Sequence, residues 1–283
     1  MIGGALSRGL AVLTELAGAP DGRSVQQVAD ALDLPKSAAH RILVNLVDDG
    51  YARQDPATGD YRLTLRLVAM ALGHLAQNTV VDLARPVLQR LAGVSGELVR
   101  LSLVDGDRLV WVAKAQGATA GLKYDPDPGA QAQLSCTANG LAWLSGFGDE
   151  HALELVLRQG WGRPGEFGPR APVTVDDFLD LLRRARADGY AHVVDSFEAG
   201  ASAVAMPVPD RPGGRTVGVL SIAGPSIRLT VDRMLDLVPL LRQACTELTG
   251  VRPDGPDNGP NGATGSRSMN SMHARAEPGG AAE

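Results

Sequence analysis

The run of residues 34–63 constrains the fold of this chain most, because it holds a complete helix and a two-armed turn in one short stretch. Pro35 suits the first turn of a helix. Apolar residues then recur mainly at steps of three and four, at Ala39, Ile42, Leu43, Leu46 and Val47. Asp48, Asp49 and Gly50 end the helix. Two extended arms, 51–54 and 60–63, flank the turn letters DPATGD. These patterns predict a helix followed by a β-hairpin.

Two shorter helices precede this run. The first carries an apolar stripe that we expect to be buried, made of Leu6, Leu10, Leu13, Leu16 and Ala17. In the second, Ser24 followed by Gln27 is typical of a capping box, and the apolar residues Val25, Val28, Ala29 and Leu32 share one face. Three helices and a hairpin therefore form one small unit.

The polar side of the third helix has the chemistry of a DNA-recognition surface. Lys36, Ser37, His40 and Arg41 lie opposite Ile42 and Leu46 on a helical wheel. The first turns of a recognition helix enter the major groove, where such side chains meet bases and phosphates. Arg53 and Arg62 would then lie on a wing. The alternative is a protein-interaction module whose polar face is merely solvated.

The acidic balance of the chain, a net charge of -5 and a pI near 5.6, does not exclude DNA binding. Screening confines surface electrostatics to about 8–10 Å in physiological salt, so the local surface decides. Modest affinity per module makes dimerisation part of the hypothesis, and Leu65, Val68, Leu72 and Leu75 have the spacing of a coiled-coil seam. Two modules of one dimer would bind half-sites about one helical turn apart.

Residues 81–250 mix strand and helix periods. Two pairs of strands are predicted around the turns DGD and RPGGR, with three helices between the pairs and a last helix from Thr230 to Leu248. This order predicts an α+β domain with an antiparallel sheet flanked by helices. Pro86 is compatible with a helix only where that helix begins or bends. Residues 251–283 are rich in Gly, Pro, Asn and Ser, and we expect a disordered tail.

Several function classes are disfavoured. No apolar run is long enough to span a membrane, and Arg8 and Glu15 interrupt the N-terminal apolar segment, so we expect a cytoplasmic protein. Cys136 and Cys245 have no metal-ligand spacing, and we expect neither metal nor cofactor. An enzyme could use Cys136 or Ser135 as nucleophile with His151 or His192 as base, but no nucleophile elbow or triad order is present. We therefore expect no catalytic residues.

Six segments in series, "LSRGLAVLTEL", "LPKSAAHRIL", "GYARQDPATGDYRL", "DLARPVLQRLA", "RARADGYA" and "LSIAGPSIRLT", resemble the signatures of the IclR family of bacterial transcriptional regulators. The resemblance runs from Leu6 to Gly250. It implies a winged helix-turn-helix domain at 1–64, a linker helix at 65–80 and a GAF-like effector-binding domain at 81–250. Family members assemble as dimers or tetramers and control catabolic operons in response to small metabolites.

The resemblance assigns candidate residues to both functions. The expected DNA contacts are Arg8, Ser24, Lys36, Ser37, His40, Arg41, Arg53 and Arg62. The expected effector contacts lie in SCTANGLA, HVVDSFEAGASA and SIAGP, and they are Ser135, Thr137, Ala138, Asn139, Val193, Asp195, Ala201, Ala203, Ser221 and Ala223.

Departures from the family pattern indicate the kind of effector. Leu141 stands where a lysine is usual, Val193 and Val194 replace common acidic residues, and Ala201 and Ala203 replace larger ones. Smaller side chains and fewer charges predict a roomier, more apolar cavity for an aromatic or otherwise bulky metabolite.

Structural roles remain open for several of these residues. Asn139 either caps its helix or contacts ligand, Ser221 either packs or contacts ligand, and Asp195 contacts either ligand or backbone. We expect Trp111 and Trp143 in the core or at an interface, and Cys136 as a small buried hydrophobe.

The sequence thus predicts a ligand-responsive regulator, which we expect to be a repressor, bound to a palindromic double-stranded operator as a homodimer or homotetramer. The alternative is a DNA-binding protein without a small-molecule effector. The effector, the operator and the choice between repression and activation stay open.

Overall fold

The computed structural model describes residues 4–77, 80–125, 131–163 and 165–250. The chain divides into two compact units between Val81 and Asp82. Each unit is described by itself. The tail predicted at 251–283 and part of the predicted linker lie outside the described residues.

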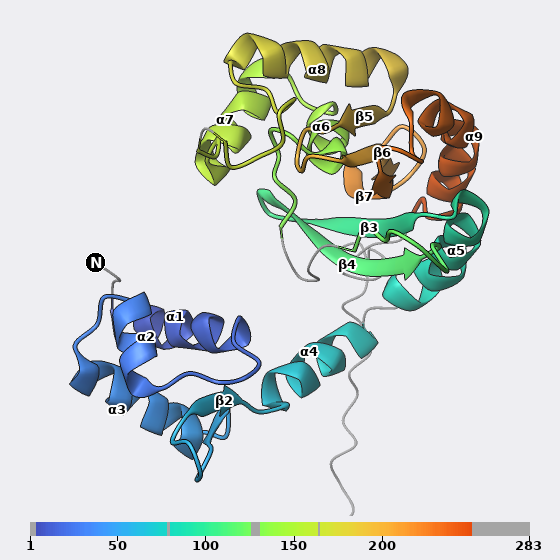
Figure 1. Cartoon of the computed structure of the whole chain (residues 1–283). Coiled ribbons are helices and arrows are strands. Elements are labelled where there is room, and N and C mark those ends of the chain that lie inside the picture. Colours follow the sequence, from blue (N-terminus) through green and yellow to red (C-terminus); the bar gives the residue numbers. More distant parts are fainter. Residues whose placement is uncertain (1–3, 78–79, 126–130, 164, 251–283) are drawn as a thin grey trace, which may run out of the picture. The chain divides into compact units, whose positions relative to one another are not determined.

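The first unit is a three-helix bundle with a two-stranded antiparallel wing (Figure 1). Its elements are α1 (Ala5–Ala17), α2 (Val25–Ala31), α3 (Lys36–Asp48), β1 (Ala52–Gln54), β2 (Tyr61–Leu63) and α4 (Arg66–Gln77). Its core consists of Val12, Leu16, Val28, Ala29, Ala39, Leu43, Ala52 and Tyr61. The predicted helices and hairpin are confirmed.

Local backbone chemistry sets the corner between α2 and α3. The Ser24 side chain accepts a hydrogen bond from Gln27 N, and the Gln27 side chain accepts one from Ser24 N, so the predicted capping box is confirmed. After α2, Asp33 has a φ of 51°, and Leu34 N donates to Ala29 O at 2.9 Å. This tight corner turns the chain into α3.

The stripe predicted to be buried on α1 is partly wrong. Leu6 and Leu10 are 77% and 54% exposed and Ala17 is exposed as well, whereas Val12 and Leu16 are buried. The reason is that α1 packs against α3 and β2 through the face that carries Val12 and Leu16. The two exposed leucines leave an apolar surface on the first unit.

The second unit is a five-stranded sheet with helices. Its elements are α5 (Val80–Ser95), β3 (Leu98–Asp105), β4 (Arg108–Gln116), α6 (Ala138–Leu144), α7 (Asp149–Gln159), α8 (Val175–Asp188), β5 (Ala191–Val194), β6 (Ala201–Pro209), β7 (Thr216–Pro225) and α9 (Val231–Glu247). The strand order is β4-β3-β7-β6-β5, and every neighbouring pair is antiparallel. The predicted α+β architecture is confirmed.

The helices of the second unit cover the sheet in two groups (Figure 1). One group packs α6 on β5, β6 and β7, with α8 against α6 and β5, and its core includes Trp143, Phe178 and Leu182. The other is α9, which packs on the same three strands. Thr230 Oγ1 caps α9 by accepting a hydrogen bond from Arg233 N.

Two further findings concern the helices. Pro86 lies inside α5, six residues after its first residue Val80. None of the described helices is both long enough and apolar enough to cross a membrane.

Candidate DNA-binding face and effector cavity

The exposed side of α3 carries the predicted recognition residues. Lys36, Ser37, His40 and Arg41 are all exposed, while Ala39 and Leu43 are fully buried against the bundle. Pro35 precedes the helix, and its carbonyl accepts from Ala38 N at 2.8 Å and Ala39 N at 3.0 Å. The amides before these have no acceptor within the helix. This end of α3 therefore offers free N–H groups beside cationic side chains, which suits a phosphate.

The same face extends further than the sequence analysis expected. Val44 and Asn45 are also exposed, one turn after His40 and Arg41. The signal was present in the spacing, because Ser37, Arg41 and Asn45 follow each other at intervals of four residues. Asn45 adds an amide that can pair with a base edge.

The wing places two cations directly opposite each other. Arg53 and Arg62 are register partners across β1 and β2, so their side chains point to the same face of the hairpin. Opposed like charges destabilise a hairpin unless an anion lies between them. Asp55 Oδ2 lies 3.8 Å from Arg62 Nη2. The Ala57 backbone N–H, followed by the Thr58 N–H and the two arginines, holds the pKa of Asp55 below its usual value.

The two remaining candidates for DNA contact lie elsewhere in the first unit. Ser24 caps α2, so one lone pair of its hydroxyl is already engaged. Arg8 is half-buried on α1.

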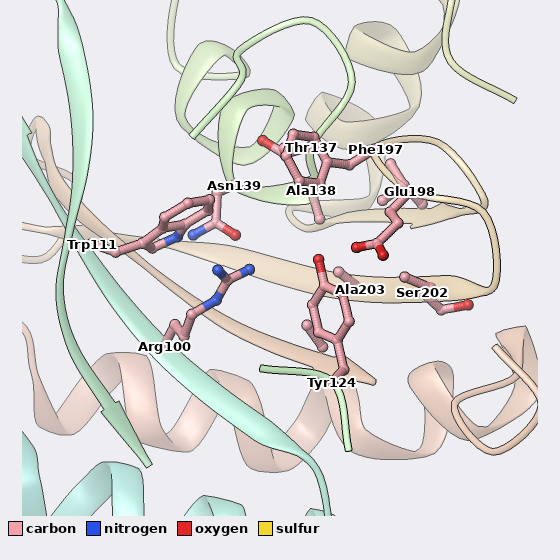
Figure 2. Close-up of a pocket in the computed structure, with 13 residues that line it drawn as sticks. Arg100, Trp111, Tyr124, Thr137, Ala138, Asn139, Phe197, Glu198, Ser202 and Ala203 are labelled. Carbon is pink, nitrogen blue, oxygen red and sulfur yellow. The ribbon is translucent and has the colours of Figure 1, made fainter. Parts of the chain in front are cut away.

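In the second unit, a cavity lies between the sheet and the start of α6 (Figure 2). It encloses about 370 Å³ of empty space, including its opening to solvent. Strands β3 to β7, α6 and the segments that follow β4 and β5 line it, through Arg100, Trp111, Tyr124, Thr137, Ala138, Asn139, Val193, Phe197, Glu198, Ala201, Ser202, Ala203 and Ala223.

Seven of the ten predicted effector residues line this cavity, and Ser135, Asp195 and Ser221 do not. Ser135 is buried and accepts from Gln133 Nε2 at 3.3 Å. Asp195 has a φ of 52°, and its carboxylate accepts from Gly200 N at 2.7 Å. Ser221 is fully buried, and its hydroxyl donates to the Arg100 carbonyl at 3.4 Å. Each of these three side chains contacts its own protein.

The start of α6 shows which residue caps it. Thr137 Oγ1 accepts from Gly140 N at 3.0 Å, so Thr137 is the N-cap and Asn139 is not. Asn139 is buried and its Nδ2 donates to Ser102 Oγ at 2.9 Å, which fixes the amide at the cavity wall. Trp143 lies in the core, as expected, and Trp111 packs against that core while also lining the cavity.

Six lining residues were not predicted as effector contacts from the sequence: Arg100, Trp111, Tyr124, Phe197, Glu198 and Ser202. Arg100 carries the strongest signal, because a charged residue interrupts the apolar strand LVRLSL. Fully buried arginine is rare unless it is paired. Tyr124 comes from the irregular segment after β4, and no periodic pattern places it.

Arg100 is the main charge in the cavity wall. It is only 7% exposed, and its guanidinium lies 4.0 Å from the centre of the Trp111 ring. Burial lowers its pKa, and Tyr124 and Asp125 partly offset that effect. Burial likewise raises the pKa of Tyr124, whose hydroxyl interacts with Arg100. Figure 2 shows the guanidinium and the Tyr124 hydroxyl both directed into the cavity.

The enzyme alternative finds no support at the same place. Burial raises the pKa of the Cys136 thiol to about 12, so the thiolate that a nucleophile needs is absent at neutral pH. His151 is exposed and pairs with Glu154 at 3.2 Å.

Comparisons with known proteins agree with this arrangement. The model of the IclR helix-turn-helix domain matches residues 5–56, and that of the bacterial transcriptional regulator IclR C-terminal domain matches residues 73–249. The HTH-type transcriptional repressor AllR of Salmonella typhi is 27% identical over 252 residues, covering 88% of this chain and 91% of AllR.

Solved structures share the fold. A regulator from Rhodococcus sp. RHA1 superposes with a TM-score of 0.70 at 26% identity, covering 86% of this chain and 96% of its own. An IclR homolog from Microbacterium hydrocarbonoxydans, complexed with 4-hydroxybenzoate, has a TM-score of 0.70 at 23% identity and covers 87% of this chain and 97% of its own. The C-terminal match alone spans more than half of the sequence. The chain therefore belongs to the IclR family of DNA-binding transcriptional regulators, which are not enzymes.

Proposed function

We propose that this protein is a cytoplasmic repressor of a catabolic or metabolic operon, which binds a palindromic operator as a dimer or tetramer and responds to a small organic effector. The observation that carries the proposal is that the chain has both a cationic recognition face on α3 and, in the second unit, a cavity lined by seven of the predicted effector residues. Repression is supported by the likeness to AllR, which is itself a repressor.

The DNA half of the proposal rests on α3 and the wing. Lys36 and Arg41 lie on the exposed face at the start of α3, within reach of major-groove base edges in the geometry of helix-turn-helix proteins. Arg53 and Arg62 would hold a phosphate between them, which relieves their mutual repulsion. Their placement supports a winged mode of binding.

Dimerisation is supported by the apolar side chains that the first unit leaves uncovered. On and just before α4, Leu65 and Leu72 are 78% and 60% exposed, and Val68 and Met70 are exposed as well. Several exposed apolar side chains on one short segment are typical of an interaction site. A second copy of the chain is the partner that would also give two recognition helices for a palindrome.

Operator retention tests the DNA half. We expect the double variant Lys36→Ala, Arg41→Ala to lose retention of an operator selected with the wild-type protein, since each lost base contact costs about 1–3 kcal/mol. The matched control Arg184→Ala, Arg211→Ala removes two exposed cations from the second unit and should retain the operator. Equal retention by the Lys36, Arg41 variant would refute the assignment of α3.

A cavity-filling variant tests the effector half. Ala203 lines the cavity on β6, and Ala203→Leu should abolish the effect of metabolites on operator retention while leaving retention itself unchanged. Ala199→Leu, at an exposed position outside the lining, is the control. A metabolite panel that shifts neither stability nor retention of the wild type would favour the alternative without effector.

A further inference from the structure

Arg100 is a buried cation, and the nearby Asp125 forms its ion pair with Lys114 instead. In the described part of the chain no carboxylate forms an ion pair with Arg100. We propose that Arg100 is an anion anchor, and that the effector is an organic monocarboxylate whose carboxylate binds the Arg100 guanidinium. This inference rests on the proposed effector function and specifies its ligand class.

A neighbouring arginine shows how this domain neutralises a cation that serves only structure. Arg228 donates from Nε and Nη2 to the two oxygens of Glu97 at 2.8 and 2.9 Å. Glu97 precedes β3, the strand that carries Arg100, and Arg100 is the more deeply buried of the two arginines. A buried guanidinium without a carboxylate is costly unless a partner arrives from outside.

Unpaired donors converge on the same cavity. Arg100 Nε and Nη1 and Trp111 Nε1 are buried, belong to residues that line the cavity and have no hydrogen-bond partner within the described protein. Guanidinium and indole N–H groups can only donate, so their natural complement is a group with several acceptor lone pairs. A carboxylate is such a group, and arginine binds it with two parallel hydrogen bonds.

The indole of Trp111 holds the anchor in place. The guanidinium lies over its ring at 4.0 Å, which occupies one face of the planar cation. The edges that carry the N–H groups remain directed into the cavity, as Figure 2 shows. Stacking thus orients the fork for a planar anion.

The opposite end of the cavity disfavours a second negative charge. Glu198 is exposed, and its carboxylate points toward the Tyr124 hydroxyl (Figure 2). Between these ends the wall is largely apolar, with Val193, Phe197 and Ala203. A ligand with one carboxylate and an apolar or aromatic body matches this order of charges. A dicarboxylate places its second charge toward Glu198.

Ligand binding to the full chain tests the anchor. Probes are benzoate, 4-hydroxybenzoate and cyclohexanecarboxylate, each paired with its neutral amide, together with terephthalate and inorganic sulfate. Isothermal calorimetry should show binding of at least one monocarboxylate, with weaker binding of its amide and of terephthalate. Arg100→Met should weaken the acid by about tenfold to a hundredfold, the effect of losing a charge-assisted hydrogen bond.

Two further variants sharpen the result. Arg184→Met removes an exposed cation of the second unit that does not line the cavity, and it should leave acid binding unchanged. Glu198→Gln should reduce the difference in binding affinity between the monocarboxylate and terephthalate. An equal loss of acid affinity in Arg184→Met would overturn the anchor, because general electrostatic attraction would then explain the binding.

Four outcomes overturn the anchor: acids and amides bind alike, sulfate binds as tightly as the acids, Arg100→Met binds the acids like wild type, or no acid binds at millimolar concentration. Failure of the proposed function gives a different pattern. Acids that bind through Arg100 without altering operator retention leave the anchor standing and refute the effector role. A neutral metabolite that releases the operator would support the effector role and refute the anchor.

Discussion

Replacing Arg100 by methionine should leave the stability of the second unit nearly unchanged, although Arg100 is only 7% exposed. Methionine is unbranched, of similar length and able to fill irregular space. An arginine that serves a ligand differs in this respect from one that serves the fold. The matched comparison is Arg228→Met, which breaks the ion pair with buried Glu97.

The expected magnitude follows from opposing contributions. Removing two buried donors without partners, Arg100 Nε and Nη1, stabilises the fold by about 1–3 kcal/mol each. Losing the contact with Trp111 costs about 2 kcal/mol. Losing the interaction with the Tyr124 hydroxyl costs about 1.5–3 kcal/mol. The central values nearly cancel, so we expect a change within about 1 kcal/mol.

The comparison variant should behave differently. Arg228→Met leaves the Glu97 carboxylate buried and unpaired, which costs about 3 kcal/mol, at the lower end of the usual range because Arg228 is partly exposed. For a domain of this size that difference corresponds to roughly 6–12 °C in Tm, at about 2–4 °C per kcal/mol.

Tryptophan fluorescence is a selective assay for this domain. The chain has three tryptophans, and Trp111, Trp143 and Trp161 all lie in the second unit. Urea unfolding followed by their emission, without ligand and at fixed protein concentration, therefore reports this unit alone. If Arg100→Met loses as much stability as Arg228→Met, with an unchanged denaturant slope, Arg100 has a structural role and the reasoning is refuted.

The remaining predictions concern the cap of α2, one glycine and the two thiols. Ser24→Ala should lower the stability of the first unit by about 1 kcal/mol through loss of the capping box. Ser24→Asp keeps a cap but adds a negative charge, so it should weaken operator retention if Ser24 lies near a phosphate. Equal operator retention by both variants would place Ser24 away from the DNA. Gly117→Ala should prevent folding of the second unit, because a Cβ there would clash with the Ala92 carbonyl oxygen. A Cβ at Gly148 would have no neighbour within 4 Å, so the control Gly148→Ala should fold normally. Circular dichroism of both variants checks this. Burial raises the pKa of both Cys136 and Cys245 to about 12, so neither native thiol should react with a thiol reagent at pH 8. Because the unfolded thiols ionise near 9.0 and the folded ones near 12, their contribution to stability is complete below pH 9 and is lost as the pH rises toward 12; thermal unfolding against pH checks this sign.

Local chemistry made the secondary structure predictable. The Ser24 and Gln27 pair, Pro35 before α3 and Thr230 before α9 act within one helical turn, so the sequence alone identifies these helix starts. The strand pairs flank turns whose residues favour tight reversal, and Gly106 and Gly213 indeed have φ values of 57° and 70°. These signals need no knowledge of distant contacts.

Burial of α1 was not predictable in the same way. Leu6 and Leu10 share the helical spacing of Leu13 and Leu16, but periodicity alone does not identify the partner that covers each position. The bundle covers only the part of α1 that faces α3 and β2. The sequence therefore identifies the apolar positions of α1 correctly, but it does not show which of them are covered within the unit.

The residues that line the cavity were likewise only partly predictable from the sequence. Thr137, Ala138 and Asn139 are consecutive, and the family pattern points to them together. Arg100, Trp111 and Tyr124 come from β3, β4 and the following segment, and only the sheet register and the path of the chain bring them to α6. Ser221 lies on the register row of Arg100 but is not part of the lining, and its hydroxyl donates to the Arg100 carbonyl.

These positions refine the expected effector. Val193 and Val194 stand where acidic residues are common in the family, and Val193 lines the cavity. Without carboxylates on that strand, the described wall offers Arg100 no internal counter-ion, and the only acidic lining residue is Glu198 at an exposed position. Loss of acidic side chains therefore does not make the cavity neutral. It leaves one buried positive charge in an otherwise apolar wall, which favours a bulky ligand with a single negative charge.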